Sequence, residues 1–148
     1  MKSFLCEFIL SCTVLTGAET AVEELTYGTV LFDYYIEDYE KALVTTLVAQ
    51  RQGKTGENAA RFDLARGSLA FAQGLYGYSS ETFAALSAGE LTGLERMRLS
   101  FHLAREYHRR GDWDALETAL AEIDLGQSWF GHRPYHPEVE YLRSELSL

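Results

Sequence analysis

The sequence predicts an all-α fold: a right-handed stack of about three antiparallel helical hairpins with a capping helix at the C-terminal end. From residue 20 onward, apolar residues recur at the three- and four-residue spacing of helices, and no segment alternates with period two long enough to indicate a sheet. Glycine or aspartate interrupts this pattern at short intervals, as expected at helix ends. At three of these breaks an aromatic residue follows directly.

Length and composition favour one folded domain. The chain has 148 residues, of which 47% are hydrophobic and 24% charged, which excludes a wholly disordered chain. The 22 acidic and 13 basic residues give a net charge of −9, and this balance argues against nucleic acid as a partner. No stretch after the N-terminal leader approaches the ~20 apolar residues that a membrane-spanning helix needs, so no integral membrane segment is predicted.

The N-terminus has the pattern of an export signal. Lys2 is followed by a mostly apolar run over 8–15 and by the small residues 16–18, which predicts a signal peptide over 1–18 and a periplasmic or exported domain over 19–148. Glu7 interrupts the apolar pattern, and the alternative is an N-terminal helix of a cytoplasmic protein. Both cysteines lie in this leader, so a cleaved chain has no thiol.

Seven helices are predicted along the chain, each supported by its periodicity and by signals at its ends. Thr92 and Glu95 have the spacing of a capping box, Asp112 can cap the helix that follows it, and Pro137 suits the first turn of the last helix. Glycines at 53, 77, 89 and 111 are expected to end helices in a left-handed conformation. The predicted ranges are 21–36, 39–52, 58–75, 80–88, 92–110, 113–124 and 137–146.

Repeated turns connect these helices. The pairs Asp38-Tyr39, Gly77-Tyr78 and Asp112-Trp113 place their aromatic residues 39 and 35 positions apart. The segment 103–113, LAREYHRRGDW, resembles a tetratricopeptide repeat (TPR), and the whole chain is similar to the N-terminal part of bacterial exported TPR proteins. The resemblance implies a solenoid with a concave groove. A generic all-α bundle is the alternative.

Two expectations follow from the third repeat. Trp113 is expected to bury its ring between hairpins. Pro137 to Leu148 is expected to form a helix that caps the array, or to begin a further repeat if the natural array is longer.

No catalytic, cofactor-binding or metal-binding residues are predicted. His132 and His136 are separated by Pro134, and no third ligand lies close in sequence, whereas metal sites usually take three or four ligands. No nucleophile elbow or phosphate-binding loop is present.

A row of arginines is the best candidate for partner binding. Helical spacing puts Arg98, Arg105 and Arg109 on one face, and the TPR resemblance places that face in the groove. The alternative is that these arginines are solvated or paired within the chain. With the aromatic residues expected near them, the candidate partner-binding residues are Tyr34, Tyr35, Arg98, Phe101, Arg105, His108 and Arg109.

These observations predict a non-enzymatic scaffold that binds a peptide or helix of a partner protein. Two other functions stay open. One is an enzyme with a loop-borne site near 129–136, and the other is a structural fragment of a longer exported TPR assembly protein.

Overall fold

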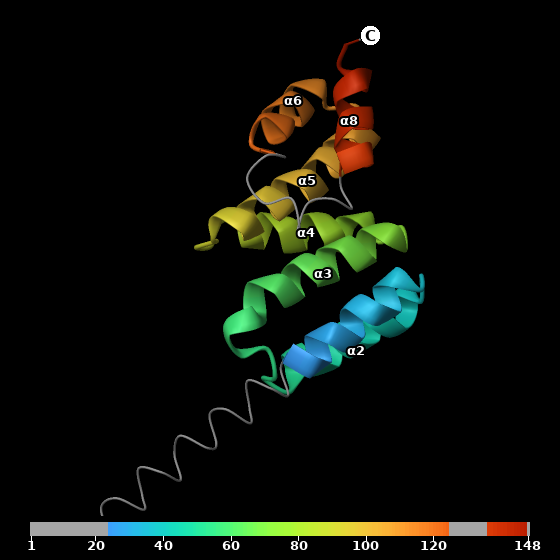
Figure 1. Ribbon diagram of the computed structural model, residues 1–148, viewed down its shortest axis with the longest axis vertical. Helices are drawn as coiled ribbons and strands as arrows, with labels where there is room; N and C mark the ends of the chain where they lie inside the picture. Colours follow the sequence, from blue (N-terminus) through green and yellow to red (C-terminus); the bar gives the residue numbers. More distant parts are fainter. Residues whose placement is uncertain (1–23, 125–135, 148) are drawn as a thin grey trace, which may run out of the picture. The chain divides into compact units, whose positions relative to one another are not determined.

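The computed structural model describes residues 24–124 and 136–147, and these residues contain helices and turns but no strand. The all-α prediction is confirmed; the handedness of the stack and the TPR relationship stay predictions. The first helix covers described residues 24–35, and the others follow as labelled in Figure 1. They are α2 (Tyr39–Arg51), a short 3₁₀ turn (Gly56–Asn58), α3 (Ala59–Ala72), α4 (Tyr76–Ser87), α5 (Gly93–Arg110), α6 (Trp113–Ala121) and α8 (His136–Glu145). The predicted leader and the predicted loop site near 129–136 lie almost wholly outside the described residues.

The chain divides into two compact units, each with its own core. The first unit ends at Leu75 and the second begins at Tyr76. Six buried apolar side chains form the core of the first unit: Val30, Ala42, Leu43, Ala49, Phe62 and Leu69. In the second unit, α5, α6 and α8 share a core that includes Phe101, Ala104, Leu116, Val139 and Leu142. The predicted C-terminal helix therefore packs against the last hairpin.

The helix ends follow the local signals in the sequence. Thr92 and Glu95 form the predicted capping box, in which the Thr92 hydroxyl accepts from the Glu95 backbone N–H and the Glu95 carboxylate accepts from that of Thr92. Asp112 caps α6 by accepting from the backbone N–H of Ala115. Gly53 and Gly111 have the predicted positive φ, at 67° and 70°.

Three turns share one conformation at a period of 37 residues. Glu37, Gly74 and Gly111 all have left-handed backbones, with φ of 63°, 75° and 70°. In each turn the next residue donates its backbone N–H to the carbonyl five residues before it, and the left-handed residue donates to the carbonyl three before it, as in a Schellman motif. Tyr39, Tyr76 and Trp113 then begin α2, α4 and α6.

The second turn was predicted at the wrong place. It lies at Gly74, whereas Gly77 lies inside α4, which begins at Tyr76 and not at residue 80. Gly89 also lacks the predicted left-handed backbone. The aromatic residues after the turns are therefore evenly spaced by 37 residues, not by 39 and 35.

We call the helix after each turn helix B of its repeat. Its pattern of buried positions recurs with the same 37-residue period. Three positions, counted along helix B and, in the third copy, to just beyond its end at Ile123, are buried in all copies, and we call them its core positions. They are Ala42, Ser79 and Leu116; Thr46, Phe83 and Leu120; and Ala49, Leu86 and Ile123. The helix before each turn is helix A: the first helix, α3 and α5. In each unit a helix A packs on the helix B that precedes it, α3 on α2 and α5 on α4.

The expected burial of Trp113 is wrong. Its side chain is 48% exposed, and its ring meets that of His108 edge to face with 5.8 Å between ring centroids. As the first residue of α6, Trp113 lies beside the turn that joins α5 to α6, and the interior of this unit is filled instead by Ala104 and Leu116, both 0% exposed.

Candidate functional site

The predicted arginine row lies along α5, but its members have different environments. Arg98 is half-buried and Arg109 is exposed. Arg105 forms an ion pair with Glu138 of α8, with 2.8 Å between Nε and Oε1, and 22% of its side chain is exposed. The row is thus partly paired within the second unit, which was the alternative to an open groove.

Helix α8 covers much of the face that the sequence assigned to a partner. Phe101 is 3% exposed and belongs to the core that α5 shares with α8. His108 Nε2 lies 3.5 Å from Glu145 Oε2, also on α8. Phe101 is therefore a core residue in this structure, while Arg105 and His108 hold the C-terminal helix in place.

Exposed aromatic side chains gather where α5 ends. The guanidinium carbon of Arg109 lies 3.9 Å from the ring centroid of Tyr76, close enough for a cation–π interaction. Next to Arg109, the His108 ring contacts Trp113 and Tyr141 edge to face. Tyr76, Trp113 and Tyr141 are 38%, 48% and 52% exposed. We call Tyr76, Arg109, Trp113 and Tyr141 the aromatic–arginine surface.

Tyr34 and Tyr35 belong to the first unit. Their rings meet edge to face at 5.8 Å, and Tyr34 also contacts Tyr39 across the first turn at 5.6 Å. Tyr34 is half-buried, whereas Tyr35 is 67% exposed. Of the two, Tyr35 is therefore the one whose ring is open to a partner.

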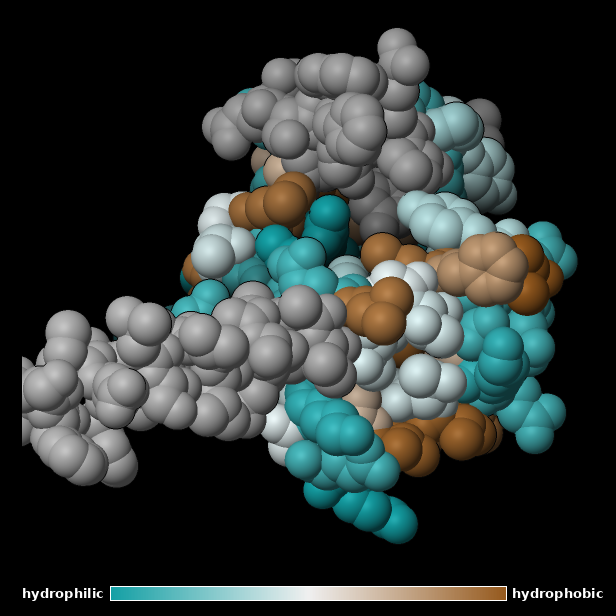
Figure 2. Space-filling view, turned by 60° about the horizontal axis from the view of Figure 1, so that its bottom comes forward, coloured by the Kyte–Doolittle hydropathy of each residue, from teal (hydrophilic) through white to brown (hydrophobic). Residues whose placement is uncertain are grey.

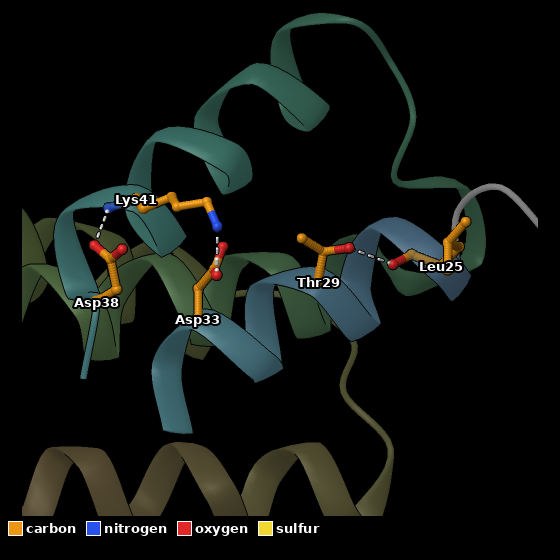
Figure 3. A network of polar contacts seen from close by, with 5 residues as sticks. All are labelled: Leu25, Thr29, Asp33, Asp38 and Lys41. Carbon is orange, nitrogen blue, oxygen red and sulfur yellow. Dashed lines mark hydrogen bonds and ion pairs between the residues drawn. The ribbon is translucent and has the colours of Figure 1, made fainter. Parts of the chain in front are cut away.

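An ion pair fixes the first turn beside these tyrosines. The Lys41 ammonium lies 2.8 Å from Asp33 Oδ1, and the Lys41 backbone N–H donates to Asp38 (Figure 3). The Asp33 carboxylate is 0% exposed, and the hydrogen bond to it raises the pKa of Lys41 above its usual value. Asp33 occupies the turn position that is Ala70 in the second repeat and Tyr107 in the third, so this ion pair is specific to the first repeat.

Sequence reasoning missed the polar contacts buried between α4 and α5. The imidazole of His102 stacks on Phe83 with 5.5 Å between ring centroids, and the Ser80 hydroxyl donates to the Glu106 carboxylate, which is 3% exposed. Burial lowers the pKa of His102 to about 3, helped by the positive charges of Arg105 and Arg98. Aligning the sequence at a period of 37 residues, with the second turn at Gly74, puts His102 and Glu106 on the face of helix A that meets the preceding helix B. This alignment is the signal that could have found them.

The described residues hold no group of three or more His, Cys, Asp or Glu side chains arranged to bind a metal ion. Among these same residues, none of the helices has both the length and the apolar character needed to cross a membrane.

Neither a comparison with protein-family models nor searches of curated proteins and solved structures find a match to this chain. Function is therefore inferred from the chemistry of the chain itself.

Proposed function

We propose that this protein is a non-enzymatic, TPR-like helical-repeat module that binds a peptide or helix of a partner protein. The three turns at a 37-residue period support a repeat architecture. That period lies between the ~34 residues of TPR proteins and the ~40–47 of HEAT and armadillo repeats, all of which are built from stacked helices. Such arrays typically act by presenting a rigid binding surface.

The aromatic–arginine surface carries the proposal. Tyrosine, tryptophan and arginine are the residues that most often dominate the binding energy of protein interfaces. Here Arg109 contacts Tyr76, and His108 contacts both Trp113 and Tyr141, all within one unit. Large aromatic side chains also lose little conformational entropy on binding, since each has only two side-chain torsions.

Arg109 gives this surface its chemical preference. Arg105 and Arg110 have carboxylate partners in Glu138 and Glu106, whereas Arg109 forms no ion pair with any residue in the described part of the chain. The Tyr76 ring holds its guanidinium in place. An arginine positioned in this way can form a bidentate pair with a carboxylate. The partner segment is therefore a peptide or helix with an acidic residue next to an apolar or aromatic one.

Site-specific cross-linking tests the proposal. A photo-reactive phenylalanine derivative at Tyr141 should cross-link one partner protein, and the same group at Glu117, an exposed position on α6, should not. The affinity of that partner is then measured by calorimetry. We expect Arg109→Ala to weaken it about tenfold, or about 1.4 kcal/mol. Arg96→Ala, at the other end of α5, is the matched control and should bind like the parent. Equal cross-linking at both positions, or equal affinity of both arginine variants, would overturn the proposal.

A further inference from the structure

The outer side of the first helix carries large apolar side chains at the surface. Leu25, Phe32 and Tyr35 are 73%, 62% and 67% exposed. Ile36 continues the last helical turn, since its backbone N–H donates to the Phe32 carbonyl, and its side chain is 55% exposed. Helical spacing puts these four side chains on one side of the helix, and we call them the first-helix face. Figure 2 shows hydrophobic (brown) residues at the surface of the described chain beside residues of intermediate hydropathy (white).

The residues between these side chains leave the face open to an apolar partner. The Thr29 hydroxyl donates to the backbone carbonyl of Leu25 at 3.0 Å (Figure 3), so its hydrogen bond is made within the helix. Gly28 has no heavy atom within 4 Å of a built Cβ, which leaves room for the backbone of a second element to approach. Apolar side chains exposed singly are normal, but several on one side of a helix mark an interaction site.

The repeat shows what kind of element covers this side of a helix A. Thirty-seven residues after Leu25 and Phe32 lie Phe62 and Leu69 of α3, both 0% exposed in the core of the first unit. Their cover includes a helix, because α2 contacts α3 and contributes Ala49 to the same core. In the third repeat the same two positions are also buried, and there α4 contacts α5. The element that fits the first-helix face is therefore a helix.

Charges at the two ends of the face set the chemistry of that helix. Glu24 directly precedes Leu25, and Glu37 directly follows Ile36. Both glutamates are exposed, and neither forms an ion pair with a residue in the described part of the chain. The sequence has no lysine or arginine between residues 3 and 40, and the next one, Lys41, is ion-paired within the first turn. Carboxylates placed in this way favour a partner with basic residues beside its apolar ones.

We propose that the first-helix face binds an amphipathic helix of a partner protein, with an apolar stripe flanked by lysine or arginine. The stripe packs on Leu25 and Phe32 as α2 packs on α3, and the basic residues pair with Glu24 and Glu37. A second copy that pairs the same face is disfavoured, because it brings these carboxylates towards one another. This site belongs to the first unit and goes beyond the aromatic–arginine surface of the second unit, which takes an acidic partner.

Two synthetic peptides serve as probes. Both have about the length of α2 and carry leucine at positions i, i+4 and i+7, the spacing of the core positions of helix B. One has lysine at the flanking positions, and the other has glutamate there. Binding to the full chain is measured by the fluorescence anisotropy of the labelled peptide. We expect the lysine peptide to bind at least about tenfold more tightly than the glutamate peptide.

Variants of the chain then locate the binding, because a net charge of −9 attracts a basic peptide to any part of the surface. Phe32→Ser and Leu25→Ser should each weaken the lysine peptide about tenfold, since each removes a large apolar contact. Tyr78→Ser, which changes an exposed aromatic residue of the second unit, is the matched control and should bind like the parent. Circular dichroism checks that every variant is folded, which is expected because Leu25 and Phe32 are mostly exposed to begin with.

A second pair of variants tests the charges. Replacing both Glu24 and Glu37 with glutamine should weaken the lysine peptide about fivefold, since two surface ion pairs are lost. The same change at Glu90 and Glu117, two exposed glutamates of the second unit, removes equal charge and should leave the affinity unchanged.

Three results would each show the proposal to be wrong. The first is a lysine peptide that does not bind the full chain, because the face is then covered already or is not a docking site. The second is equal affinity of the test and control variants in either pair. The third is a parent chain that sediments as a dimer and that Phe32→Ser converts to a monomer, because a second copy then occupies the face.

Discussion

The environment of His102 makes the stability of the protein depend on pH. The folded chain keeps this imidazole neutral down to a pKa of about 3, whereas an unfolded chain gives it the ordinary value of 6.5. The unfolded state therefore binds an extra proton below about pH 6.5, so the free energy of unfolding falls as the pH drops from there and is unaffected above it. Between pH 7 and 5.5 we expect a loss of about 1 kcal/mol, measured by denaturant melts.

A variant without the imidazole separates this effect from other titrations. His102→Gln should have lower stability at every pH, because the stacking on Phe83 is lost, but should show a smaller loss between pH 7 and 5.5. The other three histidines, His108, His132 and His136, are present in both proteins, so their contribution cancels in the comparison. An identical pH dependence in parent and variant would mean that folding does not lower the pKa of His102, and would contradict this prediction.

At the level of the helices, alanine should have opposite effects on stability at the two glycines near the second turn. Gly74 has φ of 75°, where an added Cβ is strained, so Gly74→Ala should destabilise the protein by about 1–2 kcal/mol. Gly77 lies in the first turn of α4 with no heavy atom within 4 Å of a built Cβ, so Gly77→Ala should be neutral or stabilise by up to about 1 kcal/mol. Thermal melts of the two variants compare them directly, and a reversed order would place the turn at Gly77.

Those glycines also show which structural features the sequence alone could predict. The caps at Thr92 and Asp112 were predictable because each depends on a few adjacent residues. Both Gly74 and Gly77 are followed within two residues by a tyrosine, and local chemistry does not distinguish them. Packing does, because a helix that begins at Tyr76 puts Phe83 at a core position.

The candidate site was predictable to a similar extent. Helical spacing correctly put Phe101 and Arg105 near one another on α5, where the Arg105 guanidinium lies 5.8 Å from the Phe101 ring. Spacing does not show which element covers a face, and here α8, more than 25 residues further along the chain, pairs with Arg105 through Glu138. Contacts made over such separations depend on tertiary packing, which single-sequence patterns do not encode.

At the scale of the whole molecule, the two separate cores should confine the effect of a core substitution to the unit that contains it. In repeat proteins the stability is close to a sum of terms for each repeat and its neighbours, so damage to one core need not loosen another. Leu69 and Leu116 are both 0% exposed, one in each unit. Replacing either with alanine should cost about 2–5 kcal/mol, the usual range for a buried leucine.

Hydrogen exchange followed by mass spectrometry shows where that cost falls. Leu69→Ala should speed amide exchange mainly in the first helix, α2 and α3, and Leu116→Ala mainly in α5, α6 and α8. The reason is that each variant lowers the free energy of opening only for the helices that share its core. The two variants are matched controls for one another, since the substitution and the burial are the same. If either variant accelerates exchange equally in both units, the chain opens as one cooperative body, and a sum of local repeat terms does not describe its stability.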